Sequence, residues 1–162
     1  MKTGNIIFLG DWISDVYVNC TDVIHNQEII DKLNLIVEGE NAAIWAFGYL
    51  LSFIPEENKD YAASVFNIHR DQRDIFRLKL RNLNQIPPRP KENYQLPFNV
   101  EDIVTAYELA VFIENRLIGI YLQLFKIIEP ENRKEILDIA LQGSIRLLEF
   151  KDRPRALPGS ID

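Results

Sequence analysis

Proline residues divide this chain into long uninterrupted segments, and that division limits the fold more than any other feature. The eight prolines are Pro55, Pro87, Pro88, Pro90, Pro97, Pro130, Pro154 and Pro158. Proline breaks a helix interior but is tolerated at a helix start, so the stretches between these positions are free to be helical throughout. We therefore predict helices near 26–54, 56–84, 100–128 and 131–150.

Apolar residues recur every three or four positions in each segment, which is the spacing of one helix face. The third segment shows this best, at Ile103, Tyr107, Ala110, Leu117, Tyr121, Leu124 and Ile128. Asn99, just before this segment, is the expected N-cap. Each helix must bury its stripe against the others, because such helices are not stable alone.

The connections between the segments predict the topology. Few residues separate the first helix from the second, or the third from the fourth, so each pair is expected to form an antiparallel hairpin. The link at 85–99 is long and rich in proline, which suits a crossover along the bundle. The sequence therefore predicts an all-α, antiparallel four-helix bundle with one long crossover between helices two and three, the arrangement of ferritin-like folds.

The ends of the chain are expected to lie outside this bundle. Residues 1–25 are predicted to form an N-terminal extension or arm, in which the apolar stretches at 6–9 and 16–18 fit either short strands or a packing arm. The bundle is expected over 26–155, followed by a C-terminal tail over 156–162.

The composition excludes several classes of function. The chain carries 18 Lys and Arg against 24 Asp and Glu, and the net charge of -6 disfavours nucleic-acid binding, which depends on neutralising phosphates. No apolar run approaches the roughly 18 residues that span a bilayer, so no membrane association is expected. A single cysteine, Cys20, and the lack of a secretory signal predict a cytoplasmic protein.

Three titratable residues interrupt the apolar stripes near the middle of three different helices. Glu40, His69 and Glu114 each fall three or four residues after an apolar member of their stripe. The spacing therefore directs all three side chains towards the bundle centre. Because an isolated buried charge is costly, these groups must be paired, neutral or metal-bound.

Two glutamates and a histidine form part of the ligand set of a di-iron carboxylate centre. The complete set takes a Glu from each of two helices and a Glu-x-x-His pair from each of the other two. Here Phe66 stands three positions before His69, and the fourth helix has Gly143 and Ser144 where a ligand is required. Half of the set remains, which leaves an iron or manganese site as one interpretation.

The other interpretation is a structural polar cluster without a cofactor. Arg70, Arg73 and Asp74 follow His69 closely and are the expected supporting residues, since an arginine that reaches a core glutamate would neutralise it. Arg146 is assigned instead to a basic C-terminal end, where cations complement the helix dipole. No catalytic residue is predicted, because no nucleotide-binding, zinc-protease or hydrolase motif is present.

Several motifs follow one another in the order of a known family. They are Glu-Asn-Ala-Ala-Ile-Trp-Ala-Phe-Gly at 40–48, His-Arg-Asp-Gln-Arg-Asp at 69–74, Tyr-Gln-Leu-Pro-Phe at 94–98, Glu114, and Ala-Leu-Pro-Gly at 156–159. Together they resemble a ferritin-like domain family of unknown function, from which the chain departs at Asn41, where the family usually has His. The resemblance implies a ferritin-like bundle and brings no established activity.

Two functions remain as alternatives. The first is a non-catalytic bundle with a structural polar centre, acting through self-association or a protein partner. The second is an iron- or manganese-binding protein that uses Glu40, His69 and Glu114 for oxidase or storage chemistry. The incomplete ligand set favours the first.

Overall fold

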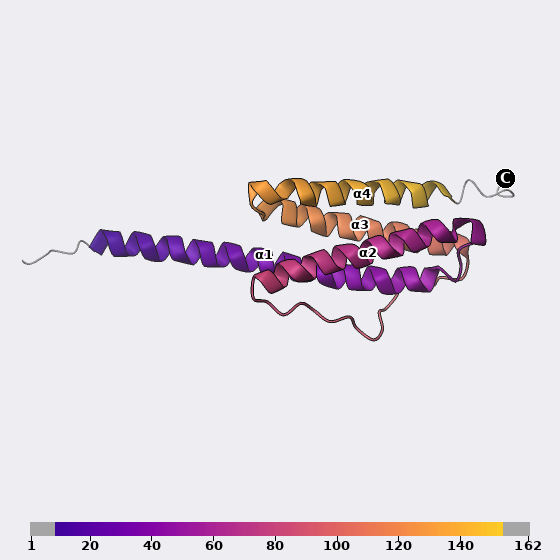
Figure 1. The fold of residues 1–162 in the computed structure, drawn as a ribbon, viewed down its shortest axis with the longest axis horizontal. Coiled ribbons are helices and arrows are strands. Elements are labelled where there is room, and N and C mark those ends of the chain that lie inside the picture. The colour runs from indigo at the N-terminus through magenta and orange to yellow at the C-terminus, as the bar shows by residue number, and fades with distance from the viewer. Residues whose placement is uncertain (1–8, 154–162) are drawn as a thin grey trace, which may run out of the picture.

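Four long helices and one short 3-10 helix make up the described chain (Figure 1). The computed structural model describes the backbone of residues 9–153 and the side chains of residues 25–153. In chain order the elements are α1 (Leu9–Leu50), α2 (Glu56–Asn82), α3 (Ile103–Ile127), η1 (Pro130–Asn132) and α4 (Arg133–Asp152). The prediction of an all-α four-helix bundle is confirmed.

The first helix is longer than predicted, because it begins at Leu9 rather than near residue 26. The stretch at 16–18 is helical, so its interpretation as a strand is wrong; residues 6–8 lie outside the described residues. Residues 9–25 contain no proline and one glycine, Gly10, so nothing in this stretch stops the helix that begins at Leu9. Figure 1 shows the N-terminal part of α1 extending past the other helices. A domain boundary at residue 26 stays a prediction.

Local side-chain and backbone signals set the helix ends. The N-cap of α3 is Asp102 rather than Asn99: Asp102 Oδ1 accepts from the Thr105 backbone N–H at 2.8 Å, while Thr105 Oγ1 accepts from the Asp102 backbone N–H at 3.1 Å. This reciprocal capping box is what Asn99 lacks. At the end of α2, Asn84 has a positive φ of 57°, and Gln85 N–H reaches back to the Leu80 carbonyl at 2.9 Å. Asn84 therefore closes α2 as a Schellman turn.

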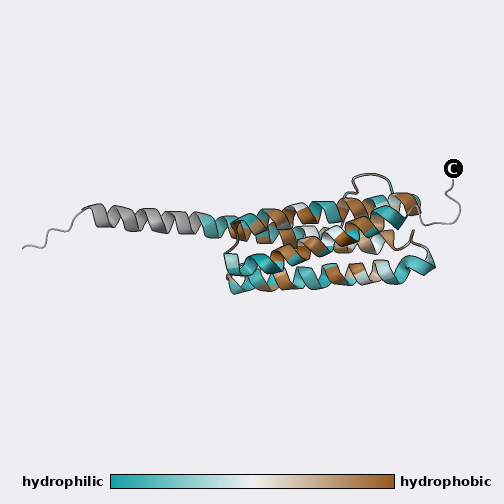
Figure 2. Cartoon of the chain, turned by 90° about the horizontal axis from the view of Figure 1, so that it is seen from above, coloured by the Kyte–Doolittle hydropathy of each residue, from teal (hydrophilic) through white to brown (hydrophobic). Residues whose placement is uncertain are grey.

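The helices pack as two hairpins joined by a crossover. A short turn at 51–55 makes α1 and α2 antiparallel, and η1 does the same for α3 and α4. The crossover over 83–102 runs outside the bundle and returns the chain to the end where α2 begins, so α2 and α3 are parallel (Figure 1). Figure 2 shows apolar and polar residues alternating along the coloured parts of the helices, and the apolar ones supply the surfaces that pack together.

The spacing between the helices is not uniform. Cα atoms approach within 8 Å between α1 and α2, between α1 and α3, and between α3 and α4, but not between α2 and α4. Long side chains span that wider separation: Lys79 Nζ lies 2.8 Å from Glu135 Oε2, and the Tyr61 hydroxyl donates to Glu149. The α2–α4 side is therefore the more open side of the bundle.

Two apolar clusters make up the core. One gathers around Phe76, Tyr121 and Ile136, and the other around Phe47, Tyr107 and Phe150. On α2, α3 and α4 the buried charged residues fall between these clusters. The bundle therefore has a polar layer between two apolar ends. The predicted tail at 156–162, with its Ala-Leu-Pro-Gly motif, lies outside the described residues.

Candidate functional site

Three helices bring Glu40, His69 and Glu114 together in the polar layer. Glu40 is on α1, His69 on α2 and Glu114 on α3, and all three are 0% exposed. His69 Nδ1 lies 2.8 Å from Glu40 Oε2, while His69 Nε2 lies 3.4 Å from Glu114 Oε1. Because the two ring nitrogens face different carboxylates, the imidazole separates the two glutamates.

The fourth helix contributes a cation to this layer. Arg146 Nε donates to Glu114 Oε1 at 2.6 Å, and Arg146 Nη2 donates to Glu114 Oε2 at 3.0 Å. Such two-point contacts between guanidinium and carboxylate are among the stronger ion pairs in proteins. Both oxygens of Glu114 are thus engaged by a side chain that stays protonated.

A glycine makes room for this ion pair. A Cβ atom at Gly143 would lie 3.3 Å from Glu114 Oε2 and 3.5 Å from Arg146 Nη2. A ligand was expected at Gly143 or Ser144 in a complete di-iron set; at Gly143 the missing side chain leaves the space that the Arg146–Glu114 pair fills. The α4 sequence is thereby adapted to a salt bridge.

Tyr121 completes the network on the α1 side. Its hydroxyl, buried on α3, donates to Glu40 Oε1, while His69 contacts the other Glu40 oxygen. The result is one connected network of side chains across all four helices, made of two carboxylates, an imidazole, a guanidinium and a phenol. We call these five residues, Glu40, His69, Glu114, Tyr121 and Arg146, the polar centre.

The charges of the polar centre shift the ionisation of its members. Burial by itself would lower the pKa of His69, but the Glu40 charge, the hydrogen bond to Glu40 and the nearby Glu114 carboxylate outweigh burial and raise that pKa to about 9. Burial opposes ionisation of Glu114, yet His69 and Arg146 hold its pKa below the usual value. Burial and the Glu40 charge raise the pKa of Tyr121 well above its usual value. With His69 protonated, two cations balance two carboxylates.

The predicted supporting residues lie elsewhere. Arg73 pairs with its neighbour Asp74, with Nε 2.9 Å from Oδ1, and Asp74 is exposed. The Arg70 guanidinium lies 5.9 Å from the centre of the Phe66 ring. None of these three residues contacts a core glutamate: Arg73, one turn after His69 and half-buried, pairs with Asp74, and Arg70 lies over the Phe66 ring. The arginine that neutralises Glu114 comes from α4.

Sequence reasoning assigned Arg146 to a basic chain end and Tyr121 to packing. A signal for Arg146 was present: it falls three residues after Gly143 and four before Phe150, on the buried face of α4. Tyr121 lies seven residues after Glu114 on the same helix face. Only the alignment of the helices shows which glutamate each one contacts.

Asn41, next to Glu40, is a further buried polar residue. It is 3% exposed, and neither atom of its amide has a hydrogen-bond partner among the described residues. The Asn41 side chain therefore makes no hydrogen bond to Glu40, His69 or Glu114.

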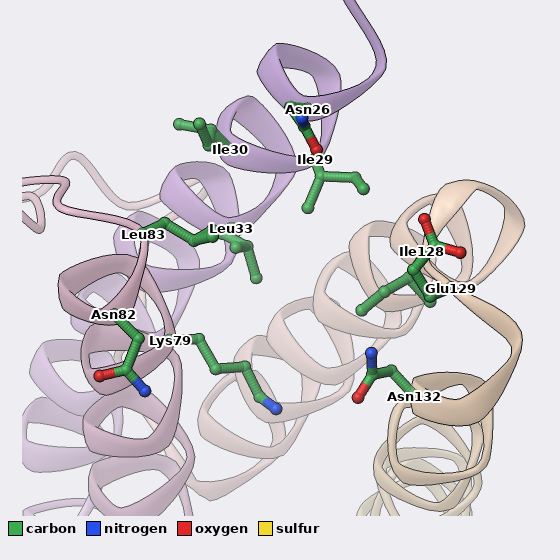
Figure 3. A pocket seen from close by; sticks show the side chains of 10 residues that line it. All are labelled: Asn26, Ile29, Ile30, Leu33, Lys79, Asn82, Leu83, Ile128, Glu129 and Asn132. Carbon is green, nitrogen blue, oxygen red and sulfur yellow. The ribbon is translucent and has the colours of Figure 1, made fainter. Parts of the chain in front are cut away.

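A cavity of about 540 Å³ opens at one end of the bundle, away from the polar centre. Ile29, Ile30 and Leu33 of α1 form its apolar wall, opposite residues from the end of α2 and the α3–α4 connection (Figure 3). Its one lysine, Lys79, is paired with Glu135. The ten lining residues include no histidine, cysteine, serine or threonine, and Glu129 is the one carboxylate among them.

The polar centre does not fit a di-iron group. The lone pairs that a metal would use on Glu114 face Arg146, and the two nitrogens of His69 face two different carboxylates, so the donors do not converge on one point. Among residues 25–153, no set of three or more His, Cys, Asp or Glu side chains has an arrangement that could hold a metal ion. The geometry is that of an internal salt-bridge network.

The fold is that of the ferritin-like class. A conserved hypothetical protein, rv2844, from Mycobacterium tuberculosis aligns with a TM-score of 0.79 at 20% identity, over 85% of this chain and 98% of that one. A ferritin-like, diiron-carboxylate protein from Bacillus anthracis str. Ames aligns with a TM-score of 0.66 at 18% identity, over 78% of this chain and 95% of that one. At these identities the similarity shows the fold alone.

Residues 33–162 match the family described as a domain of unknown function, DUF4439. The chain belongs to this family, which confirms the predicted membership of a ferritin-like family without a known function. No curated protein matches the sequence. No helix in the described part of the chain is long and apolar enough to cross a membrane.

Proposed function

We propose that this chain is a non-catalytic ferritin-like bundle in which a salt-bridge network takes the place of a di-iron centre, and that it acts by associating with itself or with a protein partner. The observation that carries the proposal is the two-point contact of Arg146 with Glu114. A guanidinium keeps its charge at all physiological pH values, so it competes with a metal ion for the same carboxylate.

The chemistry of the polar centre supports a structural role. A catalytic acid or base must reach a substrate, yet Glu40, His69 and Glu114 are 0% exposed and already paired. The cavity at the end of the bundle holds none of the five residues of the centre. The cytoplasmic location expected from the sequence remains part of this proposal.

The alternative is an iron- or manganese-binding protein that uses Glu40, His69 and Glu114. The observation in its favour is that these three residues come from three helices and meet in the middle of a ferritin-like bundle. It requires Arg146 to leave Glu114 when the metal enters.

A thermal-shift titration separates the two functions. A ligand that binds only the folded state at 100 times its Kd adds about 2.7 kcal/mol of stability, which raises the melting temperature. We expect saturating Mn(II), and Fe(II) without oxygen, to leave the melting temperature unchanged. Elemental analysis of the purified protein is the companion measurement, with substoichiometric metal as the expected result.

A melting temperature that rises with metal in the wild type and stays constant in Glu114→Gln would overturn the proposal in favour of the metal-binding function. Glu108→Gln, an exposed change on the same helix, is the matched control. Glu108→Gln removes the same negative charge as Glu114→Gln and leaves the polar centre intact.

A further inference from the structure

A second cavity, of about 250 Å³, lies between α1, α3 and the crossover. Residues 94–97 of the crossover form one of its walls, and side chains from α1 and α3 form the others. We call this space the crossover cavity. None of the five residues of the polar centre lines it, so the crossover cavity is a separate feature of the bundle.

The walls of the crossover cavity are apolar and largely aromatic. Small residues of α1, among them Ala42 and Ala46, lie on one side, and the rings of Trp45, Tyr94 and Phe112 come from α1, the crossover and α3. The Trp45 and Tyr94 ring centres are 5.7 Å apart and their planes are inclined by 46°. Ligand cavities typically combine such apolar walls with a few polar groups that orient the ligand.

One of the fifteen lining residues is charged, and it is Arg116 of α3. The Arg116 guanidinium lies 5.4 Å from the centre of the Phe112 ring, within the range of a cation–π contact that holds it beside the cavity. Within residues 25–153, Arg116 forms no ion pair with an acidic side chain. The crossover cavity thus has a cation whose charge the neighbouring side chains leave uncompensated.

This charge determines the chemistry of a fitting ligand. No aspartate or glutamate lines the crossover cavity; Glu101 lines an adjoining hollow that shares Trp45 and Tyr94 with it. An amine placed in the cavity would be repelled by Arg116, and a neutral ligand would leave its charge uncompensated. A carboxylate matches the planar donors of a guanidinium, and an aromatic body packs well against aromatic walls.

We propose that the crossover cavity binds a small aromatic carboxylic acid, with the ring of the ligand packed among Trp45, Tyr94 and Phe112 and its carboxylate at Arg116. Cavities for drug-sized ligands measure about 300–1,000 Å³, so a volume of about 250 Å³ suits a ligand of one or two rings. This inference goes beyond the proposed function, because it adds a ligand to a bundle whose polar centre is structural.

A matched series of three probes tests the chemistry of the ligand. Titration calorimetry of the full chain compares 3-phenylpropionate, 3-phenylpropanol and 3-phenylpropylamine, which differ in the group at the end of the chain. We expect the carboxylate to bind about tenfold more tightly than the alcohol, since a hydrogen bond to a charged group contributes at least that much, and the amine to bind most weakly. Equal affinities for the acid and the alcohol would overturn the assignment to carboxylic acids.

Tryptophan fluorescence places the ligand. The chain has two tryptophans, Trp12 and Trp45, so Trp12→Phe leaves Trp45 in the wall of the cavity as the single reporter. Its emission should change and saturate as 3-phenylpropionate is added, at the affinity measured by calorimetry. Binding that leaves this emission unchanged would place the ligand elsewhere and overturn the proposal, as would the absence of binding.

Two variants test the residues themselves. Arg116→Met should weaken binding of 3-phenylpropionate about tenfold and leave the affinity for 3-phenylpropanol unchanged, a split that a general loss of structure would not produce. Arg81→Met, at an exposed arginine near the end of α2, is the matched control and should bind as the wild type does. Ala42→Phe should abolish binding by filling the cavity, with circular dichroism as the check that the helices remain.

These outcomes are independent of the proposed function. Binding of 3-phenylpropionate that survives both Arg116→Met and Ala42→Phe overturns the crossover cavity as the site. Neither that result nor a chain that binds no aromatic acid alters the metal titration, on which the non-catalytic assignment depends.

Discussion

The Arg146 guanidinium engages both oxygens of the Glu114 carboxylate, at 2.6 Å from Nε and 3.0 Å from Nη2, in the middle of the bundle. The pair joins α3 to α4 at the level where His69 of α2 approaches the same carboxylate. The Glu114 carboxylate therefore connects three helices, and its closest cation is the side chain of Arg146.

Breaking this pair from one side should be strongly destabilising. Arg146→Met leaves Glu114 buried with one cation fewer, and the expected loss is about 3–5 kcal/mol in the free energy of unfolding, measured by urea denaturation. Arg116→Met, at an exposed arginine of α3, should lose less than about 1 kcal/mol. A similar loss in both variants would mean that Glu114 is solvated.

The two glycines at 119 and 143 should respond oppositely to alanine. At Gly143 a Cβ atom would lie 3.1 Å from Ile118 Cγ1 and 3.3 Å from Glu114 Oε2, so Gly143→Ala should lose about 1–3 kcal/mol of stability through overpacking. At Gly119 nothing lies within 4 Å, so Gly119→Ala should gain about 0.5–1 kcal/mol from helix propensity. Thermal unfolding of the two variants side by side checks the contrast; equal effects would show that residue 143 is not tightly packed.

His69 should make the stability depend on pH above neutrality. Its pKa is about 9 in the folded protein against 6.5 for an unperturbed histidine, so the folded state binds the proton more tightly. The stabilisation is therefore complete below pH 6.5 and is lost as the pH rises through 9, with a total change on the order of 3 kcal/mol.

Urea unfolding at several pH values across this window measures that change. The dependence of the free energy of unfolding on pH in this window should disappear in His69→Gln. It should persist in His25→Gln, because His25 lies on the surface outside the polar centre. A wild-type slope that survives in His69→Gln would show that another group titrates.

Tyr121 should be required for its hydroxyl as well as for its ring. Tyr121→Phe removes the donor to Glu40 Oε1 inside the core, and the expected loss is about 1–3 kcal/mol, the effect of leaving a buried acceptor unpaired. Tyr49→Phe, at a tyrosine that is 38% exposed, should change stability by less than about 0.5 kcal/mol. Chemical denaturation compares the two, and a neutral Tyr121→Phe would indicate that Glu40 is satisfied by His69 alone.

Much of the bundle could be predicted from the sequence because its signals are local. The prolines and the three-four spacing of apolar residues predict four helices, and the short and long connections predict two hairpins with a crossover. The predicted start of α3 was wrong because two residues suited to an N-cap lie close together. Asn99 was a suitable cap by residue type, but Asp102 has Thr105 three residues later and forms the reciprocal pair.

The polar centre is likewise predictable from the sequence only in part. The positions of Glu40, His69 and Glu114 on apolar stripes follow from helical periodicity, so the sequence alone directs them inwards. Their partners are not local: Arg146 lies 32 residues from Glu114, and Tyr121 lies 81 residues from Glu40. Arg70, Arg73 and Asp74 follow His69 within five residues, but Arg73 pairs with Asp74 and the Arg70 guanidinium lies over the Phe66 ring.

The sequence by itself determined the helices, their connections and the inward direction of three titratable side chains, because these depend on backbone preferences and on a 3.6-residue period. Only the tertiary structure decided that an arginine from α4, admitted by Gly143, neutralises Glu114 and that His69 bridges two carboxylates. The physical reason is that a buried charge is compensated by whichever group the packing of the helices brings within a few ångströms, and that distance depends on how the helices align rather than on their separation along the chain.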